Sequence, residues 1–190
     1  MEREDKDLIN DIKQGKKEAI DEIIKKHQKR VYNIAYGLVM DYDKAWDISQ
    51  EVFVKLVRNI GQFREESSFT TYLYRVVMNA FYDFKRRDKH YDRSILLSET
   101  TGENDNVKFE IKDVINIEED SEKKFLKDDI KKAMTELTDI QRQVFVMKNM
   151  EGLAIKEIAE FFHLADGTVK SHLNRAIEKI KAKLKGRTNG

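Results

Sequence analysis

The stretch EIAEFFHLADGTVKSHLNRAIEKIKAKL, which runs from Glu157 to Leu184, decides the fold of the C-terminal part of this chain. Apolar residues recur every three or four positions on both sides of a short break, which is the spacing of two amphipathic helices. The break, Asp166–Thr168, predicts a tight turn between helices at Ile155–Phe162 and Val169–Lys185. Such a pair is either a helix-turn-helix unit or a charged hairpin with a solvated basic face.

The polar face of the second predicted helix favours the helix-turn-helix. Thr168 stands where a hydroxyl can cap this helix or bond a phosphate. The lysines from Lys179 to Lys185 come late in the helix and can only follow a phosphate backbone. Four polar residues come early, where a docked recognition helix meets base edges. These residues, which we expect to contact DNA, are Lys170, Ser171, Asn174 and Arg175.

Helical periodicity extends along the rest of the chain, which has no proline among its 190 residues and only eight glycines. The sequence therefore predicts an all-α protein. From Asp88 to Ser121 the periodicity is lost and Ser, Thr, Asn and acidic residues accumulate, as in a linker. We expect two small helical domains, 1–90 and 122–187, joined by an acidic flexible linker, 91–121. The other expected helices are Asp7–Gln14, Glu18–Gly37, Tyr42–Ile60, Phe69–Arg87, Glu122–Leu137 and Asp139–Asn149, the last capped by Thr138.

Charge is segregated along a chain whose formal net charge is only +1. Residues 94–122 hold nine acids and two bases, whereas residues 168–187 hold seven bases and one acid, a pattern associated with nucleic-acid partners. Cysteine is absent and the four histidines are scattered, so neither a disulfide framework nor a metal site is expected. No cofactor-binding or catalytic motif occurs, and we expect no enzyme. The charged N-terminus and the lack of a long apolar run predict a cytoplasmic protein without membrane insertion.

The first half carries a second basic face, on the predicted helix Phe69–Arg87. Its cations alternate with aromatic rings, and rings beside cations suit the binding of unstacked single-stranded bases. We expect Phe81 and Phe84 to be core residues, whereas Tyr74 and Tyr82 are candidates for stacking. The polar and basic residues of this face are Arg75, Asn79, Lys85, Arg86 and Arg87.

Two long stretches together resemble a known family. DISQEVFVKLVRNIGQFREESSFTTYLYRVVMNAFYDFKRR is similar to region 2 of bacterial RNA polymerase sigma factors of the extracytoplasmic-function (ECF) group. LTDIQRQVFVMKNMEGLAIKEIAEFFHLADGTVKSHLNRAIEKIKAKL resembles their region 4. The resemblance covers residues 8–87 and 122–185, in the expected order. Two departures stand out, because Tyr72 occupies a position where the family usually has Trp, and Ala154 supplies no hydroxyl where a capping Ser or Thr is usual.

The resemblance implies three sets of site residues. The first would dock on the clamp helices of core RNA polymerase: Asp47, Gln50, Glu51 and Lys55. The second would capture and hold the opened minus-ten element: Phe63, Ser67, Ser68, Phe69, Tyr72, Arg75, Asn79, Arg86 and Arg87. The third would bind the minus-thirty-five element: Arg142 as a phosphate contact, Thr168, Lys170, Ser171, Asn174 and Arg175.

The implied function is a sigma factor that binds core polymerase, recognises promoter DNA and initiates transcription of a specific set of genes. Family members are commonly held by an anti-sigma protein, which is therefore an expected partner, and the linker resembles the segment that threads toward the polymerase active-site channel. The alternative is a stand-alone LuxR-like regulator, because EIA followed by TVKSHL also resembles those domains. The N-terminal half disfavours that alternative, since it shows neither strands nor a glycine-rich or acidic pocket.

Overall fold

The computed structural model describes residues 3–63, 68–94 and 129–185, without the side chains of 89–94. Within these ranges the regular elements are helices and no strand occurs, so the all-α fold class is confirmed. The chain divides into two compact units, the first formed by Met1–Ala35 with Asp43–Val114 and the second by Tyr36–Tyr42 with Ile115–Gly190. Two helical bodies are therefore present, as the sequence predicts.

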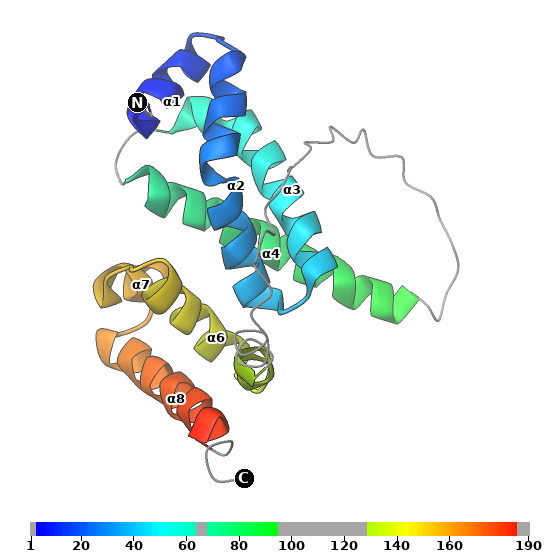
Figure 1. The fold of residues 1–190 in the computed structure, drawn as a ribbon, viewed down its shortest axis with the longest axis vertical. Helices are drawn as coiled ribbons and strands as arrows, with labels where there is room; N and C mark the ends of the chain where they lie inside the picture. Colours follow the sequence, from blue (N-terminus) through cyan, green and yellow to red (C-terminus); the bar gives the residue numbers. More distant parts are fainter. Residues whose placement is uncertain (1–2, 64–67, 95–128, 186–190) are drawn as a thin grey trace. The chain divides into compact units, whose positions relative to one another are not determined.

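The first unit is built on long helices that pack against one another (Figure 1). α1 is followed by Gly15, which adopts a left-handed φ of 84° and lies between the predicted helices Asp7–Gln14 and Glu18–Gly37. The core of the first unit is filled by fully buried side chains such as Phe53, Leu56, Leu73 and Val77. The elements of this unit are α1 (Asp5–Lys13), α2 (Glu18–Val39) as far as Ala35, α3 (Tyr42–Asn59) from Asp43 onward, the 3-10 turn η1 (Ile60–Gln62) and α4 (Phe69–Ser94).

Polar contacts fix the way in which α4 begins. His27 on α2 is buried, with its Nε2 atom 2.9 Å from Asp5 Oδ1 and its ring edge-on to the ring of Phe69, the first residue of α4. Arg30 donates to the Thr70 hydroxyl over 3.3 Å, and the N–H of Thr71 donates to Ser68 Oγ over 3.1 Å. Ser68 thereby caps α4, because it accepts one of the N–H groups that no helical carbonyl can reach.

Two boundaries in this unit differ from the predictions. α4 extends to Ser94, beyond the predicted end at Arg87, because the polar residues that follow include neither Gly nor Pro to stop it. The third helix, predicted over Tyr42–Ile60, ends at Asn59, and the chain continues through Ile60–Gln62 as the 3-10 turn η1. Residues 95–121 of the predicted linker lie outside the described residues.

The second unit contains a helical segment at 129–135, then α6 (Asp139–Phe145), the π-helical turn η2 (Val146–Met150), α7 (Ile155–Phe162) and α8 (Asp166–Lys185). α8 packs against both α6 and α7 (Figure 1). Thr138 caps α6 as predicted, since its hydroxyl accepts from the N–H of Gln141, whose side chain accepts in turn from the N–H of Thr138.

None of the helices in the described residues is both long and apolar enough to cross a bilayer.

Candidate nucleic-acid interface

α7 and α8 form a helix-turn-helix, but the turn lies earlier than the sequence predicts. His163 takes the left-handed conformation that ends α7, with φ 53° and ψ 43°. The carbonyl of Ala165 accepts from the N–H groups of Thr168 and Val169 at 2.9 and 3.2 Å, so α8 begins at Asp166. Thr168 is therefore in the first turn of α8 and does not cap it, which corrects that prediction. Gly167 also lies inside the helix, where a Cβ would meet nothing within 4 Å.

The two faces of α8 separate as predicted. Val169, Ala176 and Ile180 are buried, together with Ile158 and Ala159 of α7. The exposed side of the first turns carries Thr168, Lys170, Ser171, Asn174 and Arg175. These side chains supply one ammonium, one guanidinium, two hydroxyls and one amide, which are groups that bond phosphates and base edges.

One acid limits the length of this face. Glu178 is exposed and lies one turn beyond Asn174 on the same side of α8. A carboxylate repels phosphate, whereas the exposed Lys179, Lys181 and Lys183 attract it. The exposed face formed by Lys170, Ser171, Asn174 and Arg175 is therefore followed by a carboxylate on this side of α8.

Arg142, expected to contact phosphate, is bonded within its own unit. Its Nε atom donates to the carbonyl of Met134 at 3.0 Å, and its Nη2 atom donates to the carbonyls of Leu137 and Thr135 at 3.2 and 3.5 Å. Burial lowers the pKa of this guanidinium, although the nearby Asp139 opposes the shift. Arg142 therefore satisfies the carbonyls at the end of helix 129–135, a structural task that the sequence did not reveal.

The rings at the start of α4 form a cluster in the first unit. Phe63 and Phe69 are buried, and the Phe63 ring lies 5.9 Å from that of Phe69 and 4.9 Å from that of Tyr72, measured between centroids. Lys13 holds the carbonyl of Phe63 through a 2.8 Å hydrogen bond. Tyr72 is half-buried, and this burial raises its pKa. Of these three rings, only Tyr72 offers a partly open surface to a base.

The remaining residues predicted to bind DNA through α4 differ in their exposure to solvent. Arg75 and Asn79 are exposed, one turn apart on the same side of the helix. Tyr74, a candidate for base stacking, is fully buried, so that prediction is wrong. Tyr82 is 39% exposed. Ser67, predicted to lie in the base-capturing loop, is outside the described residues.

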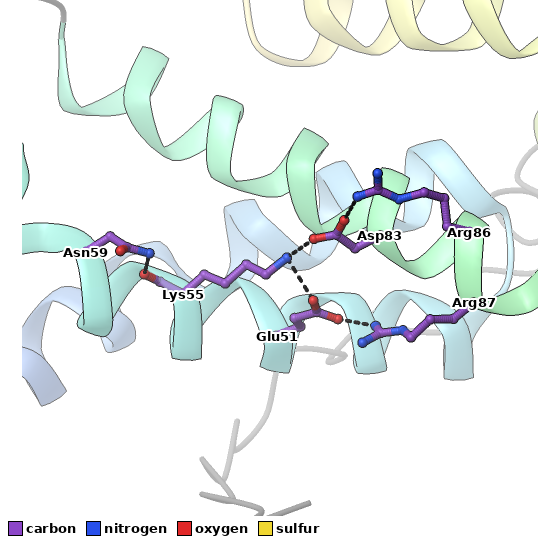
Figure 2. A network of polar contacts seen from close by, with 6 residues as sticks. All are labelled: Glu51, Lys55, Asn59, Asp83, Arg86 and Arg87. Atoms are coloured by element: carbon purple, nitrogen blue, oxygen red, sulfur yellow. Dashed lines mark hydrogen bonds and ion pairs between the residues drawn. The ribbon is translucent and has the colours of Figure 1, made fainter. Parts of the chain in front are cut away.

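A network of ions joins α3 to α4, as Figure 2 shows. The ammonium of Lys55 lies between two carboxylates, 2.8 Å from Glu51 Oε1 and in contact with Asp83. Asp83 also accepts from Arg86, and Glu51 accepts from Arg87 (Figure 2). The structure thus brings together residues from two predicted sets. Glu51 and Lys55 belong to the set predicted to dock on polymerase, and Arg86 and Arg87 belong to the set predicted to hold the opened strand.

The network is electrostatically coupled and yet open to solvent. Burial alone would lower the pKa of Lys55, but its hydrogen bonds to Asp83 and Glu51 outweigh that effect and raise it. The same Lys55 bond, followed by the bond from Arg86, lowers the pKa of Asp83. The side chains of Arg86 and Arg87 are 76% and 63% exposed, and such surface pairs contribute about 0–1 kcal/mol each. Both guanidiniums are therefore available to a stronger anion.

Sequence reasoning missed Asp83 of this network and the exposed ring of Trp46 elsewhere on α3. Asp83 lies three residues before Arg86, a spacing that by itself indicates an ion pair on a helix. Trp46 precedes Asp47 on α3 and is 37% exposed. The helical pattern of α3 could have identified Trp46, because it falls outside the buried stripe.

A helix-turn-helix with a polar outward face, joined in one chain to a second helical unit, defines a DNA-binding protein of transcription. The comparisons with known proteins identify the family. Residues 23–91 match the model of Sigma-70 region 2, and residues 127–180 match that of Sigma-70 region 4. The chain belongs to the sigma-70 family of RNA polymerase sigma factors, in its ECF group.

Relatives of this chain match it over nearly their full length. The RNA polymerase sigma-H factor of Pseudomonas aeruginosa is 30% identical over 183 residues, which are 94% of this chain and 93% of the relative. The ECF sigma factor SigW of Bacillus subtilis is 27% identical over 188 residues, or 97% and 99% of the two chains. Among solved structures, the sigma factor RpoE of Bartonella quintana, bound to the anti-sigma factor NepR, shares the fold with a TM-score of 0.63, 21% identity and coverage of 87% and 96%.

Family membership decides between the functions that the sequence left open. A LuxR-like regulator would share only the helix-turn-helix, whereas this chain also matches region 2, so the sigma-factor prediction is confirmed and the alternative is not supported. Sigma factors initiate transcription without catalysing a reaction of their own. Membership of this family therefore confirms the prediction of a non-enzymatic protein.

Proposed function

We propose that this chain is the promoter-specificity subunit of a bacterial RNA polymerase, and that it directs core enzyme to one class of promoters. The observation that carries the proposal is the occurrence of both sigma regions, in order, on one chain whose recognition helix exposes DNA-binding side chains. The proposed domains are 1–90 and 122–187, joined by the linker 91–121, whose first four residues still belong to α4.

The second unit is proposed to bind the minus-thirty-five element as a duplex. Lys170 and Ser171 suit contacts to phosphates and base edges, whereas Asn174 and Arg175 can each bond a single base through two hydrogen bonds. The late lysines of α8 would add affinity that does not depend on sequence. Arg142 is omitted from this set, because its guanidinium already donates to backbone carbonyls of its own unit, among them those of Met134 and Leu137.

The first unit is proposed to open and hold the minus-ten element. Tyr72 would stack on an unpaired base, and Arg75 and Asn79 would contact the backbone of the opened strand. Arg86 and Arg87 would join them when phosphates replace Asp83 and Glu51 as their partners. Each exchange costs little, because the exposed ion pairs are weak.

The outward side of α3 is proposed to dock on core polymerase through Asp47 and Gln50, with Glu51 and Lys55 at its edge. An anti-sigma protein is proposed as a second partner, since the similar structures of RpoE and CnrH are complexes with NepR and with the cytosolic domain of CnrY. Transcription places the proposed site of action in the bacterial cytoplasm.

Strand opening on a promoter tests this function directly. Core polymerase with the chain should make thymines of the minus-ten element reactive to permanganate, and core polymerase alone should not. Arg175→Ala should reduce opening at the cognate promoter and relax the choice of one upstream base, because a base contact of this kind contributes about 1–3 kcal/mol. Lys181→Ala is the matched control on the same helix and should weaken binding to all duplexes alike. Absence of opening with the wild-type chain would refute the function.

A further inference from the structure

The helix α1 carries none of the residues predicted to bind polymerase or DNA, and it precedes residues 23–91, which match Sigma-70 region 2. Its apolar side is nevertheless fully buried, since Leu8 and Ile9 are each 1% exposed. It also packs against the 3-10 turn η1, which ends one residue before Phe63. α1 is therefore a fixed part of the first unit, placed next to the rings at the start of α4.

The last residue of α1 holds the backbone of Phe63. The ammonium of Lys13 donates to the Phe63 carbonyl over 2.8 Å, across 50 positions of sequence. The Phe63 ring packs against the rings of Phe69 and Tyr72, and we call these three residues the ring cluster. Lys13 thus restrains one member of the ring cluster from outside it.

The first residue of α1 reaches the ring cluster through a buried histidine. Asp5 Oδ1 lies 2.9 Å from His27 Nε2, and the His27 ring meets the Phe69 ring edge-on, with centroids 5.1 Å apart. Burial alone would raise the pKa of Asp5, but its bonds to His27 and Lys26 outweigh that effect and lower it. A charged carboxylate therefore holds His27 against the second member of the ring cluster.

We propose that α1 is a brace that positions the Tyr72 ring for an unpaired base, with Lys13 and Asp5 as positioning residues. The inference rests on the proposed function, in which Tyr72 stacks on that base. The Tyr72 ring lies against both restrained rings, with centroids 4.9 Å from Phe63 and 6.2 Å from Phe69. A ring whose neighbours are already held loses less freedom when a base stacks on it, so the base is bound more tightly.

The exposed position of Lys13 allows a second explanation, in which its ammonium contacts a phosphate directly. The bond to the Phe63 carbonyl favours positioning, because it already engages this ammonium within the unit. The two explanations differ in their dependence on Tyr72. A phosphate contact acts whether or not the ring is present, whereas positioning acts through the ring and vanishes when the ring is removed.

Binding of holoenzyme to a fork-junction DNA tests the brace. The probe is a labelled fragment of a promoter that wild-type holoenzyme opens, with its minus-ten element left single-stranded. Lys13→Met removes the donor and should raise the dissociation constant about tenfold, whereas Lys13→Arg keeps a donor and should stay within about threefold of wild type. Lys16→Met is the matched control, because it removes the same charge from an exposed lysine that bonds Asp11 over 2.7 Å, and it should bind like wild type.

Two further variants separate positioning from charge. Asp5→Ala removes a carboxylate, which by charge alone would favour DNA, so an increase of about fivefold in the dissociation constant identifies lost positioning. Tyr72→Ala should weaken binding by itself, and Lys13→Met should have no further effect in that background. Circular dichroism of each variant checks that the helices are formed.

Two results would overturn the proposal. One is wild-type affinity in Lys13→Met or in Asp5→Ala, and the other is an effect of Lys13→Met that persists in the Tyr72→Ala background. A wild-type chain that opens no promoter with core polymerase would overturn the proposed function together with this proposal, whereas the first two results leave the proposed function intact.

Discussion

The unsatisfied start of α7 yields a quantitative prediction for Ala154→Ser. Ala154 has the extended conformation of an N-cap residue, with φ −69° and ψ 149°, and its carbonyl accepts from the N–H of Ile158 at 3.1 Å. Glu157 Oε2 already accepts from the N–H of Ala154 at 2.8 Å, so half of a capping box is present. A serine hydroxyl would supply the missing acceptor for the N–H of Glu157. The substitution should stabilise the second unit by about 1 kcal/mol, within the range of 0.5–2 kcal/mol for such caps.

Hydrogen exchange measured by mass spectrometry can test this increment, because peptides from α7 and α8 report on the second unit within the full chain. An increment of about 1 kcal/mol should slow the most protected amides about fivefold. Ala154→Val is the matched control, since it enlarges the same exposed side chain without adding an acceptor. Thr138→Ala, which removes the complete capping box of α6, should accelerate exchange by a similar factor. Equal exchange in Ala154→Ser and Ala154→Val would refute the reasoning.

Three further perturbations have defined outcomes. Ala159→Leu should destabilise the helix-turn-helix by about 1–3 kcal/mol in urea unfolding, because Ala159 is buried where α7 meets α8. Arg142→Ala should cost about 1.5–3 kcal/mol through the carbonyls left at Met134 and Leu137, with duplex affinity per folded molecule unchanged; a lower affinity would favour the phosphate contact instead. The lowered pKa of Asp83 makes its carboxylate stabilising above the ordinary value of 3.8, and this contribution is lost as pH falls through the lower folded value. Stability at acidic pH should therefore fall less steeply in Asp83→Asn than in wild type.

The fold was largely predictable because its signals are local. The absence of proline and the regular apolar spacing determine the helices, and Gly15 and Thr138 mark a helix end and a helix start where the structure has them. The errors occurred where local chemistry was ambiguous. A polar segment such as 88–94 is compatible both with a continued helix and with a loop, and in this structure it continues α4. At the end of α7, His163 has the left-handed conformation that glycine usually adopts at such a turn.

The candidate site was predictable only in part, because burial and pairing depend on distant residues. The spacing of α8 correctly predicts which side faces outward. Helical spacing could not predict that Tyr74 is buried within its unit. It also could not predict that Arg142 donates hydrogen bonds to carbonyls at the end of helix 129–135, such as that of Met134. The contact of Glu51 with Arg87 joins residues 36 apart in sequence, and no periodicity within one helix predicts such a pair.

We propose that this chain gives core polymerase a choice of promoter. The most direct test is co-purification of the tagged chain with core RNA polymerase, followed by run-off transcription from a promoter library. The expected result is a stable complex that transcribes a defined subset of promoters sharing minus-ten and minus-thirty-five elements. Binding of the chain to duplex DNA without polymerase, and without promoter-dependent transcripts, would contradict it.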